Sequence, residues 1–167
     1  MTAPFRIERL GPGHVRSDFS CGNQALDRYL AHQARQDVHR RVSACYVTVD
    51  SDSGRIAGYY TLAAGGVLLS GLPDTLVKLL PRYPSVPIAR LGRLAVDLRY
   101  QGRKLGAALL ADALMRAVRS EIGVFALVVD AKDELAAAFY RHHGFEHLAL
   151  AGRQLIVALK HFSPPSP

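Results

Sequence analysis

Residues 91–107 read LGRLAVDLRYQGRKLGA, and this stretch decides the fold. Its first half is apolar and predicts a strand over Ile88–Val96, and a short polar loop containing Gly102 follows. The next residues predict an amphipathic helix over Arg103–Ser120, with apolar side chains on one stripe and charged ones opposite. Such a loop suits a phosphate, because glycine lets the backbone approach a ligand and the first turn of a helix has free N–H groups.

Charge around the loop favours the same interpretation, since Arg99, Arg103 and Lys104 are all positive. The loop has neither the Gly-x-Gly-x-x-Gly of dinucleotide-binding sites nor the Gly-Lys-Ser/Thr of nucleoside triphosphate sites. The alternative is an ordinary connection between strand and helix, in which the glycines serve packing alone.

The chain has 167 residues, of which 49% are hydrophobic and 21% charged, as expected for one globular domain. We expect this domain to span residues 1–162, with a Pro- and Ser-rich tail over 163–167. Cys21 and Cys45 predict buried, reduced thiols rather than a disulfide scaffold. The N-terminus has charges where a signal peptide is apolar, and no segment has the roughly 20 apolar residues of a membrane helix. We therefore expect a cytoplasmic, unprocessed protein.

The remaining periodicity predicts strands and helices on both sides of this stretch. Tyr59 and Tyr60 are expected in a strand, with one side chain inward and the other outward. The predicted strands are Phe5–Leu10, Ala44–Val49, Arg55–Ala64, Ile88–Val96, Val124–Asp130, Gly144–Leu150 and Gln154–Leu159, and the other predicted helices are Asn23–Arg41, Thr75–Leu80 and Lys132–His142. This order predicts an α+β fold, an α/β sandwich around a mixed sheet.

Residues 101–106, QGRKLG, resemble the Gln/Arg-x-x-Gly-x-Gly/Ala acetyl-CoA loop of the GNAT superfamily of N-acetyltransferases. Lys104 departs from that pattern, because it stands where the family has its first glycine. The resemblance implies a mixed, mostly antiparallel central sheet flanked by helices, with the strand at residues 94–96 pairing with the pantetheine arm. The cofactor-binding residues that it implies are Leu94, Ala95, Val96, Gln101, Gly102, Arg103, Lys104, Leu105, Gly106, Ala107, Asp130, Ala131 and Phe139.

Residues 136–145, AAAFYRHHGF, resemble the family signature Ala-x-x-Phe-Tyr-x-x-x-Gly-Phe, in which a helix ends at Gly144. The resemblance makes Tyr140 the catalytic acid that protonates the departing CoA thiolate. A phenol of pKa about 10 can do so only as a general acid that follows charge build-up in the transition state. The alternative is a tyrosine whose ring only packs on the sheet.

Three further segments resemble one group within the family, the acetyltransferase toxins of bacterial toxin–antitoxin modules. They are residues 19–27, 58–62 and 91–97, and the group usually has Asp where Ser20 stands. The resemblance implies acetylation of the α-amine of aminoacyl-tRNA, a homodimer, and neutralisation by a ribbon–helix–helix antitoxin.

The predicted strand over Ile88–Val96 has no carboxylate that could serve as a base, and Asp97 comes only at its end. An α-amine of pKa about 8 needs little assistance to lose its proton, whereas a lysine amine of pKa about 10.4 requires a base to do so. The formal charge of +7 suits a polyanionic acceptor such as tRNA. Its candidate binding residues are Arg35, Arg40, Arg41, Arg82, Arg90 and Arg93.

Two alternatives remain open from the sequence. One is a small-molecule or protein N-acetyltransferase with the same cofactor site, and the other is a non-catalytic nucleic-acid-binding module with a degenerate loop. We expect no metal, because the histidines lack the spacing of metal ligands.

Overall fold

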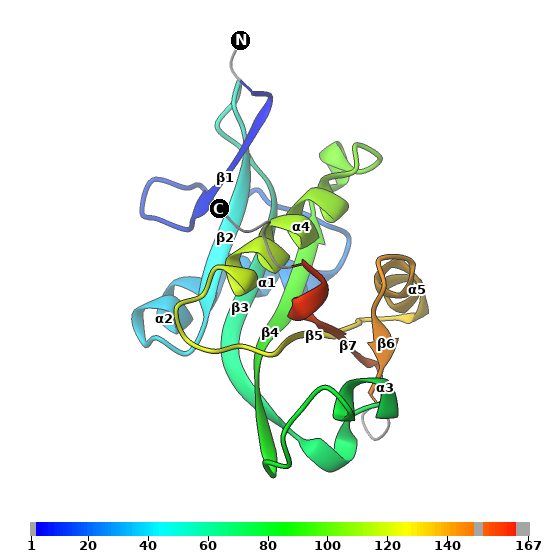
Figure 1. The fold of residues 1–167 in the computed structure, drawn as a ribbon. Helices are drawn as coiled ribbons and strands as arrows, with labels where there is room; N and C mark the ends of the chain where they lie inside the picture. The colour runs from blue at the N-terminus through cyan, green and yellow to red at the C-terminus, as the bar shows by residue number, and fades with distance from the viewer. Residues whose placement is uncertain (1–2, 149–151, 163–167) are drawn as a thin grey trace. The chain divides into compact units, whose positions relative to one another are not determined.

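The computed structural model describes residues 3–148 and 152–162. The tail expected over 163–167 and the end of the strand expected over Gly144–Leu150 lie outside these residues. The strands are β1 (Phe5–Arg9), β2 (Ala44–Asp50), β3 (Ile56–Leu68), β4 (Ser85–Val96), β5 (Ala126–Asp130), β6 (Glu146–His147) and β7 (Gln154–Ala158), and the α-helices are α1 (Gln24–His32), α2 (Ala34–His39), α3 (Asp74–Val77), α4 (Leu105–Val118) and α5 (Glu134–His142) (Figure 1). Short 3₁₀ turns lie at Leu69–Gly71, Leu98–Tyr100 and Leu159–Phe162.

The strands are hydrogen-bonded in the order β1-β2-β3-β4-β5-β7-β6. The pairs β1–β2, β2–β3, β5–β7 and β6–β7 are antiparallel, and β4–β5 is parallel. The α+β fold with a mixed, mostly antiparallel sheet is therefore confirmed. By compactness the chain divides into residues 1–63 with 92–113 and residues 64–91 with 114–167, and each part has its own core. Among the described residues, no helix is long and apolar enough to cross a membrane.

In the first part, apolar side chains of α1, β2 and β3 form a buried cluster around Leu30, Val47 and Tyr59. The predicted outward position for one of the tyrosines at 59–60 is wrong, because both side chains are 0% exposed. The Tyr59 hydroxyl donates to the Leu26 carbonyl, and the Tyr60 hydroxyl donates to Asp112 on α4. Helices thus cover both faces of β3, which residue alternation alone cannot reveal. The two cysteines are buried thiols that form no disulfide, as predicted.

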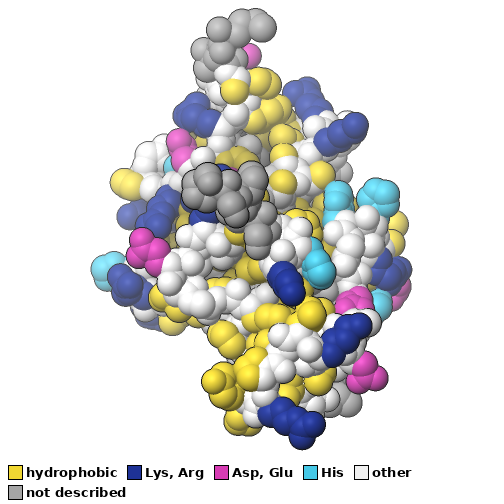
Figure 2. Space-filling view, in the orientation of Figure 1, with side chains coloured by type: hydrophobic (Ala, Val, Ile, Leu, Met, Phe, Trp, Pro, Cys, Tyr) yellow, Lys and Arg dark blue, Asp and Glu magenta, His cyan; other side chains and the backbone are white. Residues whose placement is uncertain are grey.

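The second part builds its core from α3 and the strands β5 and β7, with Leu76, Val128 and Ile156 in one cluster. β3 and β4 run on past the predicted ends into the segment 64–87. Leu68 and Tyr83 of this segment are 64% and 66% exposed. Figure 2 shows hydrophobic side chains reaching the surface at the lower end of the view.

The helix predicted over Asn23–Arg41 is interrupted at Gln33, so α1 and α2 are separate helices. The Arg16 guanidinium donates to the Leu30 and Ala31 carbonyls at 3.1 and 2.9 Å. In a continuous helix these carbonyls would accept from residues four positions later, so Arg16 replaces two helical bonds. The prediction missed this break because its cause is a residue outside the segment.

Candidate active site

The predicted cofactor loop is present, but α4 begins at Leu105 rather than at Arg103. The reason is backbone conformation, since Gly102 and Lys104 have φ of 82° and 61° in the left-handed region. The first main-chain bond into the helix runs from the Ala108 N–H to the Lys104 carbonyl. The N–H groups of residues 105–107 therefore have no intrahelical acceptor and are available to an anion.

The space beside the loop fits a ligand that approaches the backbone. A Cβ atom at Gly102 would meet no heavy atom within 4 Å, and Arg103 and Lys104 are exposed. Arg103 lies over the Tyr100 ring at 5.5 Å, which keeps its guanidinium beside the loop. Leu105 is buried in a cluster with Ala57 and Tyr100, so its side chain anchors the start of the helix and its N–H is the group it can offer to a ligand. These residues fit a pyrophosphate-bearing cofactor.

The buried carboxylate of Asp97 supports the loop through hydrogen bonds, and its side chain is 1% exposed. Its carboxylate accepts from the Ser20 N–H at 3.0 Å, from the Arg99 N–H at 2.9 Å, and from the Arg99 guanidinium at 3.0 and 2.9 Å. Burial raises the pKa of Asp97, but the hydrogen bonds from Arg99 and Ser20 outweigh burial and hold this pKa below its ordinary value. Asp97 is thus a structural carboxylate and Arg99 is its partner, so Arg99 does not add the free charge to the loop that its position in the sequence suggests.

Gln101 belongs to the same support. Its side-chain amide donates to the Val96 carbonyl at 3.0 Å and to the Cys21 carbonyl at 3.4 Å. It therefore ties the loop to the end of β4 and to the segment before α1. The ladder between β4 and β5 covers Ile88–Leu91 and stops there, so the predicted pantetheine strand, Leu94–Val96, lies beyond it.

Tyr140 lies in the last turn of α5, and its position is fixed by the way that helix ends. Gly144 has φ of 94°, its N–H donates to the Arg141 carbonyl, and the Phe145 N–H donates to the Tyr140 carbonyl. This is a Schellman motif, and it brings the Phe145 ring edge-on to the Tyr140 ring at 5.6 Å. Phe139 lies edge-on to the same tyrosine at 5.3 Å. The predicted glycine end of this helix is confirmed.

The Tyr140 hydroxyl differs from those of four other buried tyrosines. Tyr140 is 4% exposed, yet its hydroxyl has no hydrogen-bond partner among the described residues. The only fully buried side-chain polar atom without a partner in that part of the chain is Thr48 Oγ1, so the Tyr140 hydroxyl retains contact with open space. The tyrosines whose hydroxyls do donate to a partner are Tyr29, Tyr59, Tyr60 and Tyr100. Burial, and then the charge of Asp130, raise the pKa of Tyr140, so this hydroxyl stays protonated as an acid must.

Asp130 and Ala131, also predicted at the cofactor, end β5 and follow it. The Asp130 carboxylate accepts from Gln154 at 2.9 Å and from Arg90 at 3.5 Å. Arg90, a predicted acceptor residue, is therefore paired with Asp130. Ala131 is buried, and its N–H donates to the Arg153 carbonyl.

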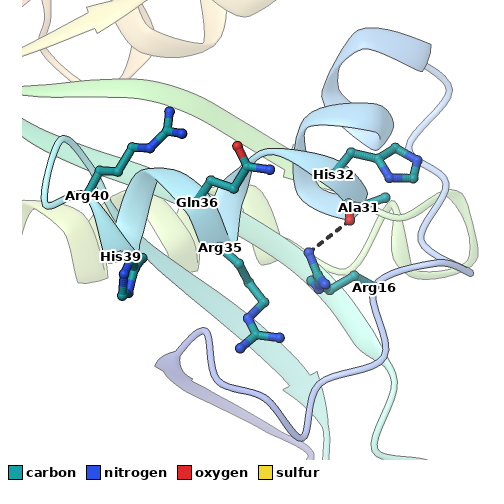
Figure 3. Close-up of a pocket in the computed structure, with 7 residues that line it drawn as sticks. All are labelled: Arg16, Ala31, His32, Arg35, Gln36, His39 and Arg40. Carbon is teal, nitrogen blue, oxygen red and sulfur yellow. Dashed lines mark hydrogen bonds between the residues drawn. The ribbon is translucent and has the colours of Figure 1, made fainter.

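The predicted acceptor arginines do not form one group. Arg35 and Arg40 line a pocket on α1 and α2 (Figure 3), and Arg41 follows α2 with φ of 61°. The Arg93 guanidinium lies 3.5 Å from the centre of the Tyr29 ring, so this half-buried residue packs against α1. Arg82 is an exposed residue between α3 and β4.

Sequence reasoning missed the other residues of this pocket. No sequence pattern identifies Arg16 as a pocket residue, because it is distant from α1 and α2 along the chain and contacts main-chain carbonyls. A signal did exist in residues 32, 35, 36, 39 and 40, which are polar or basic and recur at helical spacing.

Comparison with known proteins agrees with this site. Residues 14–145 match the acetyltransferase (GNAT) family. A tRNA-acetylating toxin of Mycobacterium tuberculosis (strain ATCC 25618 / H37Rv) is 40% identical over 132 residues, which cover 78% of this chain and 77% of the toxin.

Solved structures of similar chains include complexes of the AtaT toxin. AtaT complexed with acetyl-methionyl-tRNAfMet has a TM-score of 0.88 at 28% identity, covering 95% of this chain and 96% of AtaT. AtaTR bound with acetyl-CoA has a TM-score of 0.82 at 27% identity, covering 95% of both chains. A mutant AtaT toxin bound to the C-terminus of the antitoxin AtaR has a TM-score of 0.80 at 25% identity, covering 95% of this chain and 96% of that chain. With its loop, its tyrosine and its family match, this chain belongs to the acetyltransferase (GNAT) family and is an acyltransferase that uses acetyl-CoA.

Proposed function

We propose that this chain acetylates the α-amine of aminoacyl-tRNA and thereby blocks translation, as a toxin of a toxin–antitoxin module. The likeness to a tRNA-acetylating toxin and to AtaT complexed with acetyl-methionyl-tRNAfMet supports this acceptor. The observation that carries the chemistry is the Tyr140 hydroxyl, held in position by the end of α5 and free of any partner among the described residues.

In the proposed reaction, acetyl-CoA supplies an activated acyl thioester. The amine of the acceptor forms the new C–N bond as the C–S bond breaks and the ammonium proton is lost to water. Tyr140 gives its hydroxyl proton to the departing sulfur, which prevents a free thiolate from accumulating, and the phenolate left on Tyr140 then takes a proton back from solvent. The raised pKa keeps Tyr140 protonated where the acceptor amine is neutral, but it also makes the phenol a weaker acid, so the proton moves only as charge builds on the sulfur in the transition state.

The absence of a base fits an α-amine acceptor. β4 has no acidic residue in Ser85–Val96, and the carboxylate at its end, Asp97, is occupied by Arg99 and Ser20. A lysine amine of pKa about 10.4 would be almost wholly protonated at neutral pH, whereas about a tenth of an α-amine of pKa near 8 is neutral.

For cofactor binding we propose the main-chain N–H groups of residues 102–107, of which those of 105–107 have no intrahelical acceptor, and the side chains of Arg103 and Lys104 as the pyrophosphate site. Leu94–Val96 would pair with the pantetheine arm through the main chain, because this part of β4 lies beyond its ladder with β5. Asp130, Ala131 and Phe139 remain proposed cofactor residues near Tyr140 in the sequence.

We further propose a cytoplasmic homodimer that a ribbon–helix–helix antitoxin neutralises. The exposed side chains of Leu68 and Tyr83 are available to an interface between copies. Light scattering after size exclusion checks the dimer, and co-purification with the product of the neighbouring gene checks the antitoxin.

The test of the function is transfer of labelled acetyl groups from acetyl-CoA to bulk charged tRNA, followed by identification of the acetylated aminoacyl nucleoside. We expect label on the α-amine of the amino acid and none on uncharged tRNA. A screen of polyamines, drugs and peptides is run beside it. Label on one of these acceptors and none on charged tRNA would identify a small-molecule or protein acetyltransferase.

A further inference from the structure

The pocket on α1 and α2 is a separate feature from the cofactor loop. It has a volume of about 470 Å³ and is lined by Arg16, Ala31, His32, Arg35, Gln36, His39 and Arg40. Figure 3 shows side chains from the end of α1, from α2 and from the segment before α1 around it. We call it the α1–α2 pocket.

The α1–α2 pocket is positively charged, and no carboxylate lines it. The acid of α2, Asp37, is engaged elsewhere, since it accepts from Tyr29 at 2.7 Å and from Gln33 at 3.0 Å. The carbonyls at the end of α1 would repel an anion, but the Arg16 guanidinium binds those of Leu30 and Ala31. The two carbonyls are therefore occupied, and the Asp37 carboxylate is held by Tyr29 and Gln33, although it is near enough to Arg40 for that charge to lower the pKa of Asp37.

Arg35 and Arg40 supply free charge. Neither guanidinium group has a hydrogen bond or ion pair with another described residue, and both residues are exposed. The neighbouring side chains of His32, Gln36 and His39 are exposed too and can donate hydrogen bonds. Figure 2 shows Lys or Arg and His side chains next to each other at the left edge of the view, over α2.

We propose that the α1–α2 pocket binds phosphate groups of the RNA acceptor and positions that RNA for acetyl transfer. The inference rests on the proposed function, whose acceptor is a tRNA. Pockets for small ligands bury about 70–90% of the ligand surface among mostly apolar side chains. Here the polar donors are exposed and come from three segments, which suits a phosphate backbone running over the surface.

The experiment compares R35Q/R40Q with the control R55Q/R119Q, which removes the same charge from two exposed arginines outside the pocket. Binding of deacylated bulk tRNA is measured by fluorescence anisotropy between 50 and 300 mM salt. We expect R35Q/R40Q to weaken binding roughly ten- to thirtyfold near 0.15 M salt. The slope of log K against log salt should fall by about 0.7–0.9 for each phosphate group that the variant no longer neutralises. R35K/R40K should keep most of the affinity.

Two further measurements separate this role from folding and from the cofactor site. The acetyl-CoA melting shift should stay at the wild-type value in R35Q/R40Q. Acetyl transfer without RNA, to an ester of the amino acid that the assay on bulk charged tRNA identifies, should also stay at the wild-type value. If R35Q/R40Q binds and acetylates tRNA as the control does, the pocket assignment is wrong while the proposed function stands. If the wild type neither binds nor acetylates tRNA, both fail.

Inorganic phosphate and a nucleoside diphosphate serve as probes for a small ligand. Binding of either probe that R35Q/R40Q abolishes, with tRNA binding unchanged, would make the α1–α2 pocket a site for a free phosphate compound and overturn the RNA assignment. An acidic peptide that binds wild type but not R35Q/R40Q, again with unchanged tRNA affinity, would overturn it in favour of a protein partner.

Discussion

At the scale of single residues, Tyr140 is distinguished by a hydroxyl that has no hydrogen-bond partner among the described residues. Tyr140→Phe removes one oxygen and keeps the ring that packs against Phe145, so folding and acetyl-CoA affinity should change little. Loss of the general acid should lower kcat by about 10²–10⁴-fold with KM for acetyl-CoA nearly unchanged. Steady-state kinetics with charged tRNA measure both constants. Wild-type turnover in this variant, under conditions where chemistry limits the rate, would return Tyr140 to a packing role.

The pH dependence of turnover follows from the same residue. Burial raises the pKa of Tyr140, so the acid stays protonated as pH rises past the ordinary tyrosine value of about 10. The acceptor α-amine must be neutral, so kcat/KM should rise with pH up to about 8 and then level off. A profile on charged tRNA, corrected for ester hydrolysis, checks this. A fall in rate between pH 8 and 9.5 would contradict a tyrosine donor with a raised pKa.

At Lys104 the sequence reveals a departure from the family pattern, but it does not reveal the backbone conformation. The family pattern identified it as a departure, but only the structure shows that it adopts the φ of 61° that a glycine would adopt freely. We expect Lys104→Gly to be about 1 kcal/mol more stable than Lys104→Ala, because only the glycine relieves the left-handed strain and both remove the same charge. Urea unfolding of the two variants gives the difference. Equal stabilities would show that the loop tolerates this conformation without strain.

At the scale of elements, Asp97 links the end of β4 to the loop and to the segment before α1. Asp97→Asn replaces an accepting oxygen by an N–H₂ group that faces donors from Ser20 and Arg99. The loss should be about 2 kcal/mol of unfolding free energy, with a raised KM for acetyl-CoA. Asp18→Asn is the matched control, because Asp18 is an exposed carboxylate 4.0 Å from the same Arg99, and it should cost under about 0.5 kcal/mol. Identical behaviour of the two variants would exclude a supporting role for Asp97.

The order of the elements could be predicted from periodicity, while their ends depended on distant partners. The turn between β2 and β3 follows from its polar residues and Gly54, which has φ of 76°. The break between α1 and α2 could not be predicted, because Arg16, which occupies the carbonyls at the break, lies outside the predicted helix. The need for glycine at position 58 could not be predicted locally either. A Cβ there would lie 2.9 Å from the Ala95 carbonyl oxygen, which belongs to a distant segment of the chain. The site also divides into local and long-range features. Local motifs identified the loop and Tyr140, whereas the contacts of Asp97 with Arg99 and Ser20, which make Asp97 a structural carboxylate, were visible only in the structure.

At the scale of the whole molecule, the loop makes stability depend on acetyl-CoA. Ligand at about 100 times its dissociation constant should add roughly 2.7 kcal/mol to the free energy of unfolding. For a chain of 167 residues, this corresponds to a rise in Tm of about 5–11 °C. Gly106→Asp places a side chain and a negative charge in the first turn of α4, where the free N–H groups are proposed to meet the pyrophosphate. This variant should fold and show no shift, whereas Ala108→Asp, one residue beyond those N–H groups and exposed, should retain most of it. A folded wild-type protein whose Tm does not respond to acetyl-CoA would show that the loop, with Lys104 in place of the family glycine, does not bind the cofactor.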